Sequence, residues 1–123
     1  MRSLFYSYLF FLALMAILPL NGFTHNTMNQ VHIIHIRLDY FLHGILYLPW
    51  CFIYWNSFRP AGFAATLLMI TAGLLMAFTT EGVQYFLTYR TYNINDLLSN
   101  FLGVLLSAIA LLAYIKIKPK TTS

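Results

Sequence analysis

Long apolar stretches alternate along the chain with short polar segments. Four of the stretches approach the roughly 20 residues that a helix needs to cross a ~30 Å hydrocarbon core. The segments between them are too short to form a soluble domain, so the pattern predicts an all-α membrane protein with a single domain of four transmembrane helices. The predicted spans are residues 4–20, 38–57, 61–80 and 97–115.

The charge pattern predicts how the helices are oriented. The 123 residues are 60% hydrophobic and 8% charged. Only Arg37 and Arg90 flank the span ends on one side, whereas more basic residues flank the other: Arg2, Arg59, Lys116, Lys118 and Lys120. The positive-inside rule then places both termini of this multi-pass membrane protein in the cytoplasm. The basic residues form no patch, so the net charge of +4 does not indicate a nucleic-acid partner.

The first span has one feature of a secretory signal, because Arg2 precedes its apolar run. It lacks a convincing small-residue cleavage site, and the sequence at 19–22 favours the end of a span. We therefore expect this helix to stay in the bundle. Cys51 is the only cysteine, which excludes disulfides and cysteine-based metal sites.

All three acidic residues, Asp39, Glu81 and Asp96, fall at the same predicted end of three different spans. The link between the second and third spans is very short, so these two helices are expected to be antiparallel neighbours. A carboxylate at membrane depth costs a few kcal/mol and therefore indicates a site. Gly73 and Ala77 precede Glu81 at intervals of four residues, which predicts that Glu81 faces the interior of the bundle.

Each carboxylate has a polar neighbour one helical turn away. The pairs are Asp39 with His43, Glu81 with Gln84, and Asp96 with Asn100, and Arg90 lies in the outer loop. In one interpretation, Glu81 or the Asp39–His43 pair is a general acid or base. Arg90 then binds a phosphate or carboxylate of a lipid-linked substrate, and the remaining polar residues help to bind it. In the other interpretation, Arg90 neutralises the carboxylates, and the network of polar side chains only holds the helices of the bundle in register.

A third interpretation is a divalent metal bound by oxygen and imidazole ligands. The ligands would be Asp39, His43, Glu81 and Asp96. The charge of Arg90 opposes this interpretation. His32 and His35 lie three residues apart in the outer loop, but two imidazoles are too few for a metal site. We therefore expect neither a metal nor a cofactor.

The ordered motifs resemble those of the VanZ-like family of small bacterial membrane proteins. The resemblance covers residues 39–103, and the matching residues are Asp39, His43, Tyr47, Glu81, Gln84, Arg90, Asp96, Asn100 and Gly103. Members of the family commonly have Lys directly after the first Asp, whereas this chain has Tyr40. If that Lys supplies a positive charge to a substrate, this chain must take it from Arg90 or Arg37.

The family is named for low-level resistance to the glycopeptide teicoplanin. The resemblance implies a membrane location and a set of site residues, but no reaction. We expect a multi-pass protein of a bacterial inner membrane that binds or modifies a lipid-linked or cell-wall-related molecule at the outer face and thereby alters glycopeptide susceptibility. Its expected partners are membrane lipids and a lipid-linked envelope precursor. The alternative is a non-catalytic scaffold or partner subunit whose polar network is structural. A transporter is disfavoured, because the polar groups cluster at one end rather than at several depths.

Overall fold

The computed structural model describes residues 2–18, 32–33, 36–89 and 92–117. The helices are α1 (Arg2–Ile17), α3 (Leu38–Tyr47), α4 (Trp50–Phe58), α5 (Phe63–Phe86) and α6 (Ile94–Ile117). Two short strands, β1 (His32–Ile33) and β2 (Ile36–Arg37), form an antiparallel ladder that the sequence did not predict. Apart from this ladder, the predicted all-helical class is confirmed.

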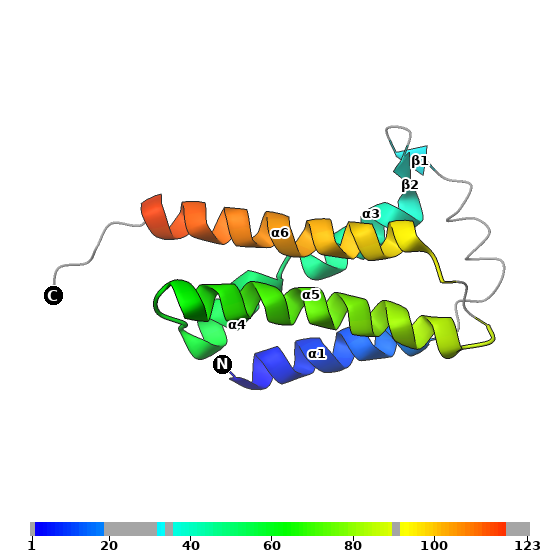
Figure 1. The fold of residues 1–123 in the computed structure, drawn as a ribbon, viewed down its shortest axis with the longest axis horizontal. Coiled ribbons are helices and arrows are strands. Elements are labelled where there is room, and N and C mark those ends of the chain that lie inside the picture. The colour runs from blue at the N-terminus through cyan, green and yellow to red at the C-terminus, as the bar shows by residue number, and fades with distance from the viewer. Residues whose placement is uncertain (1, 19–31, 34–35, 90–91, 118–123) are drawn as a thin grey trace, which may run out of the picture.

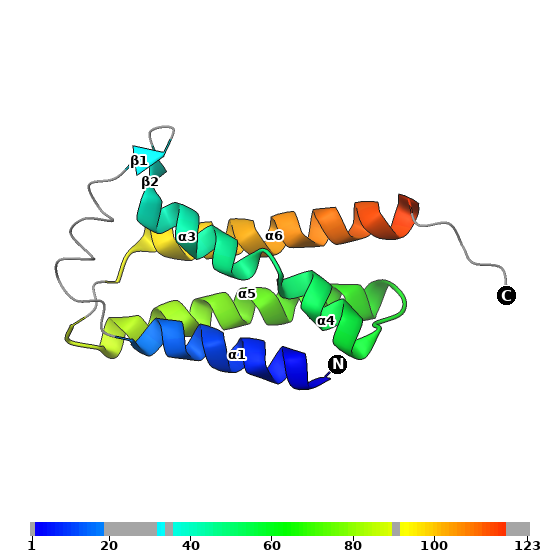
Figure 2. The ribbon, with the colours of Figure 1, turned by 180° about the vertical axis from the view of Figure 1, so that it is seen from behind.

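The helices form one bundle. α5 and α6 run antiparallel, and α1 lies along α5 (Figure 1). α3 crosses α6, whereas α4 packs against α1, α5 and α6 (Figure 2). The start of α1 and the ends of α4 and α6 lie at one end of the bundle (Figure 1). The start of α3, the end of α5 and the start of α6 lie at the other end, so the three helix ends that contain the acidic residues come together.

α5 and α6 are the two described helices that are long and apolar enough to cross a bilayer. Only 22% of the most apolar window of α5 and 33% of that of α6 is buried inside the structure. Most of their apolar surface therefore faces outward, which fits a membrane protein better than a helix from a soluble core. α1 is apolar but has only 16 residues.

The predicted second span, 38–57, is not one continuous helix. A turn at Pro49 separates α3 from α4, because proline lacks the N–H that a continuing helix requires. The N–H of Cys51, in the first turn of α4, donates a hydrogen bond to Oγ of Ser107 on α6 at 3.0 Å. A hydroxyl of a neighbouring helix thus satisfies a backbone donor at the break.

The remaining helices differ from the predicted spans at their ends. α1 ends at Ile17 rather than at residue 20. α5 continues beyond residue 80 to Phe86, so that Glu81 lies within the helix. α6 begins before residue 97, which places Asp96 in its first turn. Hydropathy underestimates the length of α5 and α6, because the polar residues at their ends are helical as well.

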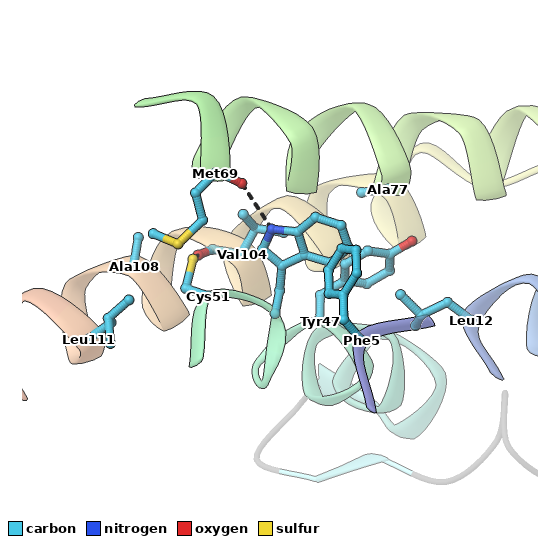
Figure 3. Close-up of a cluster of buried hydrophobic side chains, with 10 residues drawn as sticks. Phe5, Leu12, Tyr47, Cys51, Met69, Ala77, Val104, Ala108 and Leu111 are labelled. Atoms are coloured by element: carbon cyan, nitrogen blue, oxygen red, sulfur yellow. Dashed lines mark hydrogen bonds between the residues drawn. The ribbon is translucent and has the colours of Figure 1, made fainter. Parts of the chain in front are cut away.

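A cluster of buried apolar side chains lies between α4 and the neighbouring helices (Figure 3). At its centre, Nε1 of Trp50 donates a hydrogen bond to the carbonyl oxygen of Met69 at 2.9 Å. The ring of Phe5, from α1, packs edge-on against Trp50 with ring centroids 5.6 Å apart. Gly73 makes room for the indole, because a Cβ there would lie 2.6 Å from Trp50 Nε1.

α3 and α6 cross at two glycines. A Cβ on Gly103 would overlap the carbonyl oxygen of Gly44 and would lie 3.1 Å from Cβ of Tyr47. A Cβ on Gly44 would lie 3.3 Å from the carbonyl oxygen of Ser99. Small residues allow such close approach between membrane helices. The crossing sets the position of the polar side chains that α3 and α6 contribute to the end of the bundle.

Candidate functional site

Polar side chains from three helices gather where α5 ends and where α3 and α6 begin. We call this set the polar cluster: His43 and Tyr47 of α3, Thr80, Glu81 and Gln84 of α5, and Asp96 and Asn100 of α6. All except the half-buried His43 are at most 7% exposed. Residues three or four apart share one face of a helix, which explains why each helix contributes a group of them.

Glu81 is 1% exposed. The backbone N–H of Asn93, just before α6, donates to its Oε1 at 3.5 Å. This distance exceeds the usual 2.7–3.2 Å of such bonds, so the contact is weak. Gly73 and Ala77 are buried on the same face of α5, which confirms that Glu81 points into the bundle.

His43 of α3 faces a carboxylate of α6. Its Nε2 lies 4.0 Å from Oδ2 of Asp96, and the two side chains are 16% and 7% exposed. This separation is too long for a hydrogen bond, but a protonated imidazole would form an ion pair across it. The predicted partner, Asp39, belongs to α3, and its side chain lies outside the described residues.

A small cavity of about 30 Å³ lies inside the cluster. Its polar lining consists of His43, Tyr47, Thr80, Gln84 and Asn100, and α1 supplies an apolar wall of Leu12, Met15 and Ala16. A cavity of this size with several polar partners can hold a water molecule. Oδ1 of Asn100 is buried and accepts no hydrogen bond from any residue that the structure describes.

Tyr47 and Thr80 form a chain of hydrogen bonds across two helices. Oγ1 of Thr80 donates to the carbonyl oxygen of Ala77 at 3.0 Å. A hydroxyl has only one proton to donate, so the 2.7 Å bond between Tyr47 and Thr80 has the tyrosine as its donor. This chain is complete and fixes α3 against α5.

Tyr40 occupies the position where the resemblance to the VanZ-like family departs from the common Lys. Its hydroxyl oxygen accepts hydrogen bonds from Nδ2 of Asn93 and Nδ2 of Asn95, both at 3.3 Å. Tyr40 therefore ties α3 to the start of α6, beside the segment that contacts Glu81.

The structure brings most of the predicted site residues together. His43, Glu81, Gln84, Asp96 and Asn100 belong to the polar cluster. Arg90 and the side chain of Asp39 lie outside the described residues, as do the side chains of His32, His35 and Arg37. Sequence reasoning missed Thr80 and Asn93. The signal for Thr80 was present, because it lies three residues after Ala77 and four before Gln84, on the buried face of α5.

The cluster is acidic in the part of the chain that the structure describes. Its charged groups are the carboxylates of Glu81 and Asp96, with the imidazole of His43 beside them. No three described His, Cys, Asp or Glu side chains are placed to hold a metal ion. Chemically, the arrangement offers hydrogen-bond acceptors, amide groups and an acid–base group next to an apolar bundle.

Comparison with known proteins identifies the family. The model of the family described as VanZ/LLP1 matches residues 5–116, a range that contains every residue of the polar cluster. Comparisons with curated proteins and with solved structures give no significant match. The resemblance found in the motifs of residues 39–103 is thereby confirmed. The chain belongs to the VanZ/LLP1 family.

Proposed function

We propose that the chain is a multi-pass protein of a bacterial inner membrane whose polar cluster binds the head group of a lipid-linked or cell-wall-related molecule at the outer face. The four crossings would be α1, α3 together with α4, α5, and α6. The 16 residues of α1 rise about 24 Å at 1.5 Å per residue. A short helix of this kind can be accommodated by local thinning of the bilayer.

The distribution of charge supports this orientation. Arg2 begins α1, Arg59 follows α4 and Lys116 lies in the last turn of α6, all at one end of the bundle (Figure 1). The carboxylates of Glu81 and Asp96 lie at the other end. By the positive-inside rule, the basic end with both termini faces the cytoplasm and the polar cluster faces outward.

The main support for a binding site is the buried polar cavity of about 30 Å³, which is lined by His43, Tyr47, Thr80, Gln84 and Asn100. Asn100 is 1% exposed, and its Oδ1 accepts no hydrogen bond from any residue that the structure describes. Buried polar atoms are normally hydrogen-bonded. An acceptor of this kind beside a polar cavity favours a site whose ligand or water completes the hydrogen bond.

The residues divide into roles by their chemistry. Glu81, and His43 with Asp96, are the acid–base candidates if a bond is made or broken. Gln84 and Asn100 offer amides to a polar head group. Two further predicted residues keep the roles that the sequence assigned to them, with Asp39 as an acid–base partner of His43 and Arg90 as an anion-binding group.

The test is glycopeptide susceptibility in a Gram-positive host that lacks the gene. Cells would express the wild type, Glu81→Gln or Thr79→Ala at matched membrane levels. Thr79 is the control, because it lies two positions before Glu81 and its side chain is exposed. We expect the wild type and Thr79→Ala to shift teicoplanin susceptibility and Glu81→Gln not to. If all three shift susceptibility equally, the carboxylate of Glu81 is not needed for this phenotype. If none of them shifts it, the proposed effect on glycopeptide susceptibility is contradicted.

The competing assignment is a scaffold or partner subunit in which the cluster is structural. The complete hydrogen-bond chain from Tyr47 through Thr80 to Ala77 favours it, since that chain joins α3 to α5. A structural role predicts that Glu81→Gln lowers the abundance and the stability of the protein. Loss of the susceptibility shift at unchanged abundance contradicts this alternative.

A further inference from the structure

Two arginines lie over aromatic rings at the end of the bundle that is opposite the polar cluster. Cζ of Arg2, the first residue of α1, lies 5.9 Å from the centroid of the Phe58 ring. Cζ of Arg59, which follows α4, lies 5.3 Å from the centroid of the Trp55 ring. Both distances are within the range of a cation–π contact. Phe58 and Trp55 are three residues apart on α4, so the two arginines lie over neighbouring rings at the end of this helix.

The rings beneath the arginines are held in place by three helices. Phe58 packs edge-on against Phe5 of α1, with ring centroids 5.0 Å apart. Trp55 packs edge-on against Tyr114 of α6, with ring centroids 6.4 Å apart. Rings that are fixed in this way give the guanidinium groups defined positions. A contact with a ring leaves the N–H donors of a guanidinium group available for hydrogen bonds, and their geometry matches the oxygens of a phosphate.

Arg59 has a backbone conformation that favours glycine. Its φ of 50° and ψ of 51° are left-handed, and in the part of the chain that the structure describes no other residue except glycine has a positive φ. Its N–H donates to the carbonyl oxygen of Trp55 at 2.8 Å, which ends α4. A side chain destabilises this conformation, and glycine would end the helix equally well. Backbone strain of this kind is common at ligand-binding sites, so the conformation points to a function for the arginine side chain.

The acidic residues of the chain lie too far away to neutralise these arginines. All three belong to helix ends at the other end of the bundle (Figure 1), and they are Asp39, Glu81 and Asp96. At 1.5 Å per residue, α6 alone separates Asp96 from Lys116 by about 30 Å. Lys116, in the last turn of α6, adds a further positive charge to the end that contains the arginines (Figure 1). This end of the bundle therefore attracts an anion.

The apolar surface beside these charges favours an anion that is part of a lipid. Exposed apolar side chains lie at the start of α1, at the start of α5 and at the end of α6, and they include Leu4, Phe63 and Ile117. These three helix ends lie at the same end of the bundle as the arginines (Figure 2). Basic residues next to such a surface complement an anionic phospholipid, which combines a phosphate with acyl chains.

We propose that Arg2 and Arg59 bind the phosphate of an anionic phospholipid at this end of the bundle, in the cytoplasmic leaflet of the orientation proposed above. The rings of Phe58 and Trp55 position the two guanidinium groups, and the exposed apolar side chains beside them contact the acyl chains. The site lies at the opposite end from the polar cluster. It therefore goes beyond the proposed function and does not depend on what the polar cluster binds.

The experiment is a lipid titration of the full chain in micelles of a non-ionic detergent. Native mass spectrometry separates the protein with a bound lipid from the protein without one. The probes are phosphatidylglycerol, which has a net negative charge, and phosphatidylcholine with the same acyl chains, which has no net charge. Each arginine should contribute about fivefold in affinity, so phosphatidylglycerol should bind more than about tenfold more tightly than phosphatidylcholine.

Three variants distinguish a site from a general effect of charge. Arg2→Gln and Arg59→Gly should each reduce the affinity for phosphatidylglycerol about fivefold. Arg59→Gly should do so at an unchanged or higher temperature of thermal unfolding, because glycine suits the left-handed conformation. Lys116→Gln is the matched control, because it removes the same charge from the same end of the bundle but from α6. It should keep the affinity within about twofold of the wild type, because a screened surface charge outside the site contributes little.

Three results would overturn the inference: equal affinity of the wild type for both lipids, wild-type affinity of Arg2→Gln, or a loss in Lys116→Gln as large as in the arginine variants. The last result would mean that the lipid responds only to the net charge of this end. If Arg59→Gly unfolds, Arg2→Gln and Lys116→Gln still decide between the two explanations. The susceptibility test concerns the polar cluster, so its outcome is independent of all three results.

Discussion

The crossing of α3 and α6 makes Gly103 the most sensitive glycine of the bundle. Gly103→Ala places a Cβ against the carbonyl oxygen of Gly44 and 3.1 Å from Cβ of Tyr47. A backbone carbonyl cannot rotate away as a flexible side chain can, so the two helices must separate. Separation displaces Tyr47 and His43 from the residues that they face across the crossing. The substitution should therefore affect both stability and the geometry of the polar cluster.

The magnitude follows from comparison with Gly82→Ala. Both positions lie inside long helices, so each substitution contributes the same gain in helix propensity, roughly 1 kcal/mol at most. This gain cancels in the comparison. A Cβ at Gly82 meets nothing within 4 Å, so Gly82→Ala causes no overpacking. The difference in stability between the two variants is therefore the cost of overpacking at Gly103, about 1–3 kcal/mol for an added methyl group in a packed interior.

The assay is unfolding of the purified chain in mixed micelles, with a denaturing detergent as titrant and helicity by circular dichroism as the signal. We expect Gly103→Ala to be less stable than Gly82→Ala by about 1–3 kcal/mol. Gly82→Ala itself should match or exceed the wild type. Equal stability of the two variants would refute the close crossing of α3 and α6.

Two further substitutions test hydrogen bonds between helices, with the same unfolding assay. Ser107→Ala leaves the N–H of Cys51 without its acceptor at the helix break and should cost about 1–3 kcal/mol. Ser99→Ala, on the same helix but less buried, should cost less, and equal losses would contradict the role of Ser107. Tyr47→Phe removes the donor to Thr80 and should cost about 0.6 kcal/mol, the average for interhelical bonds in a membrane protein. A loss above ~2 kcal/mol would mean that the hydroxyl has partners beyond Thr80.

Much of the polar cluster was predictable because helices impose a fixed spacing. Glu81 and Gln84 had to share a face of their helix, and the buried repeat of Gly73 and Ala77 had to turn that face inward. Antiparallel neighbours with short links then bring the acidic helix ends together. None of these steps requires knowledge of long-range contacts.

The contacts between helices were not predictable in the same way. Local spacing relates His43 to Asp39, whose side chain lies outside the described residues, and gives no sign that the crossing of α3 and α6 brings Asp96 within 4.0 Å of His43. Beside the break at Pro49, the N–H of Cys51 is accepted by Ser107, which follows Cys51 in sequence by more than fifty residues. The groove that Glu81, Tyr85 and Tyr92 help to line was not predicted either, because exposed aromatic residues at the end of a span look like ordinary interfacial anchors.

The most direct test of the central claim is the free energy of unfolding of Glu81→Gln in the same micelles. If the polar cluster is a binding site, the variant should be as stable as the wild type or more stable, because a neutral amide of similar shape is less costly to bury than a carboxylate. If the cluster is a structural brace, the variant should lose about 1.5–3 kcal/mol, the contribution of hydrogen bonds to a charged group. A loss of that size would contradict the assignment of Glu81 to a ligand-binding site.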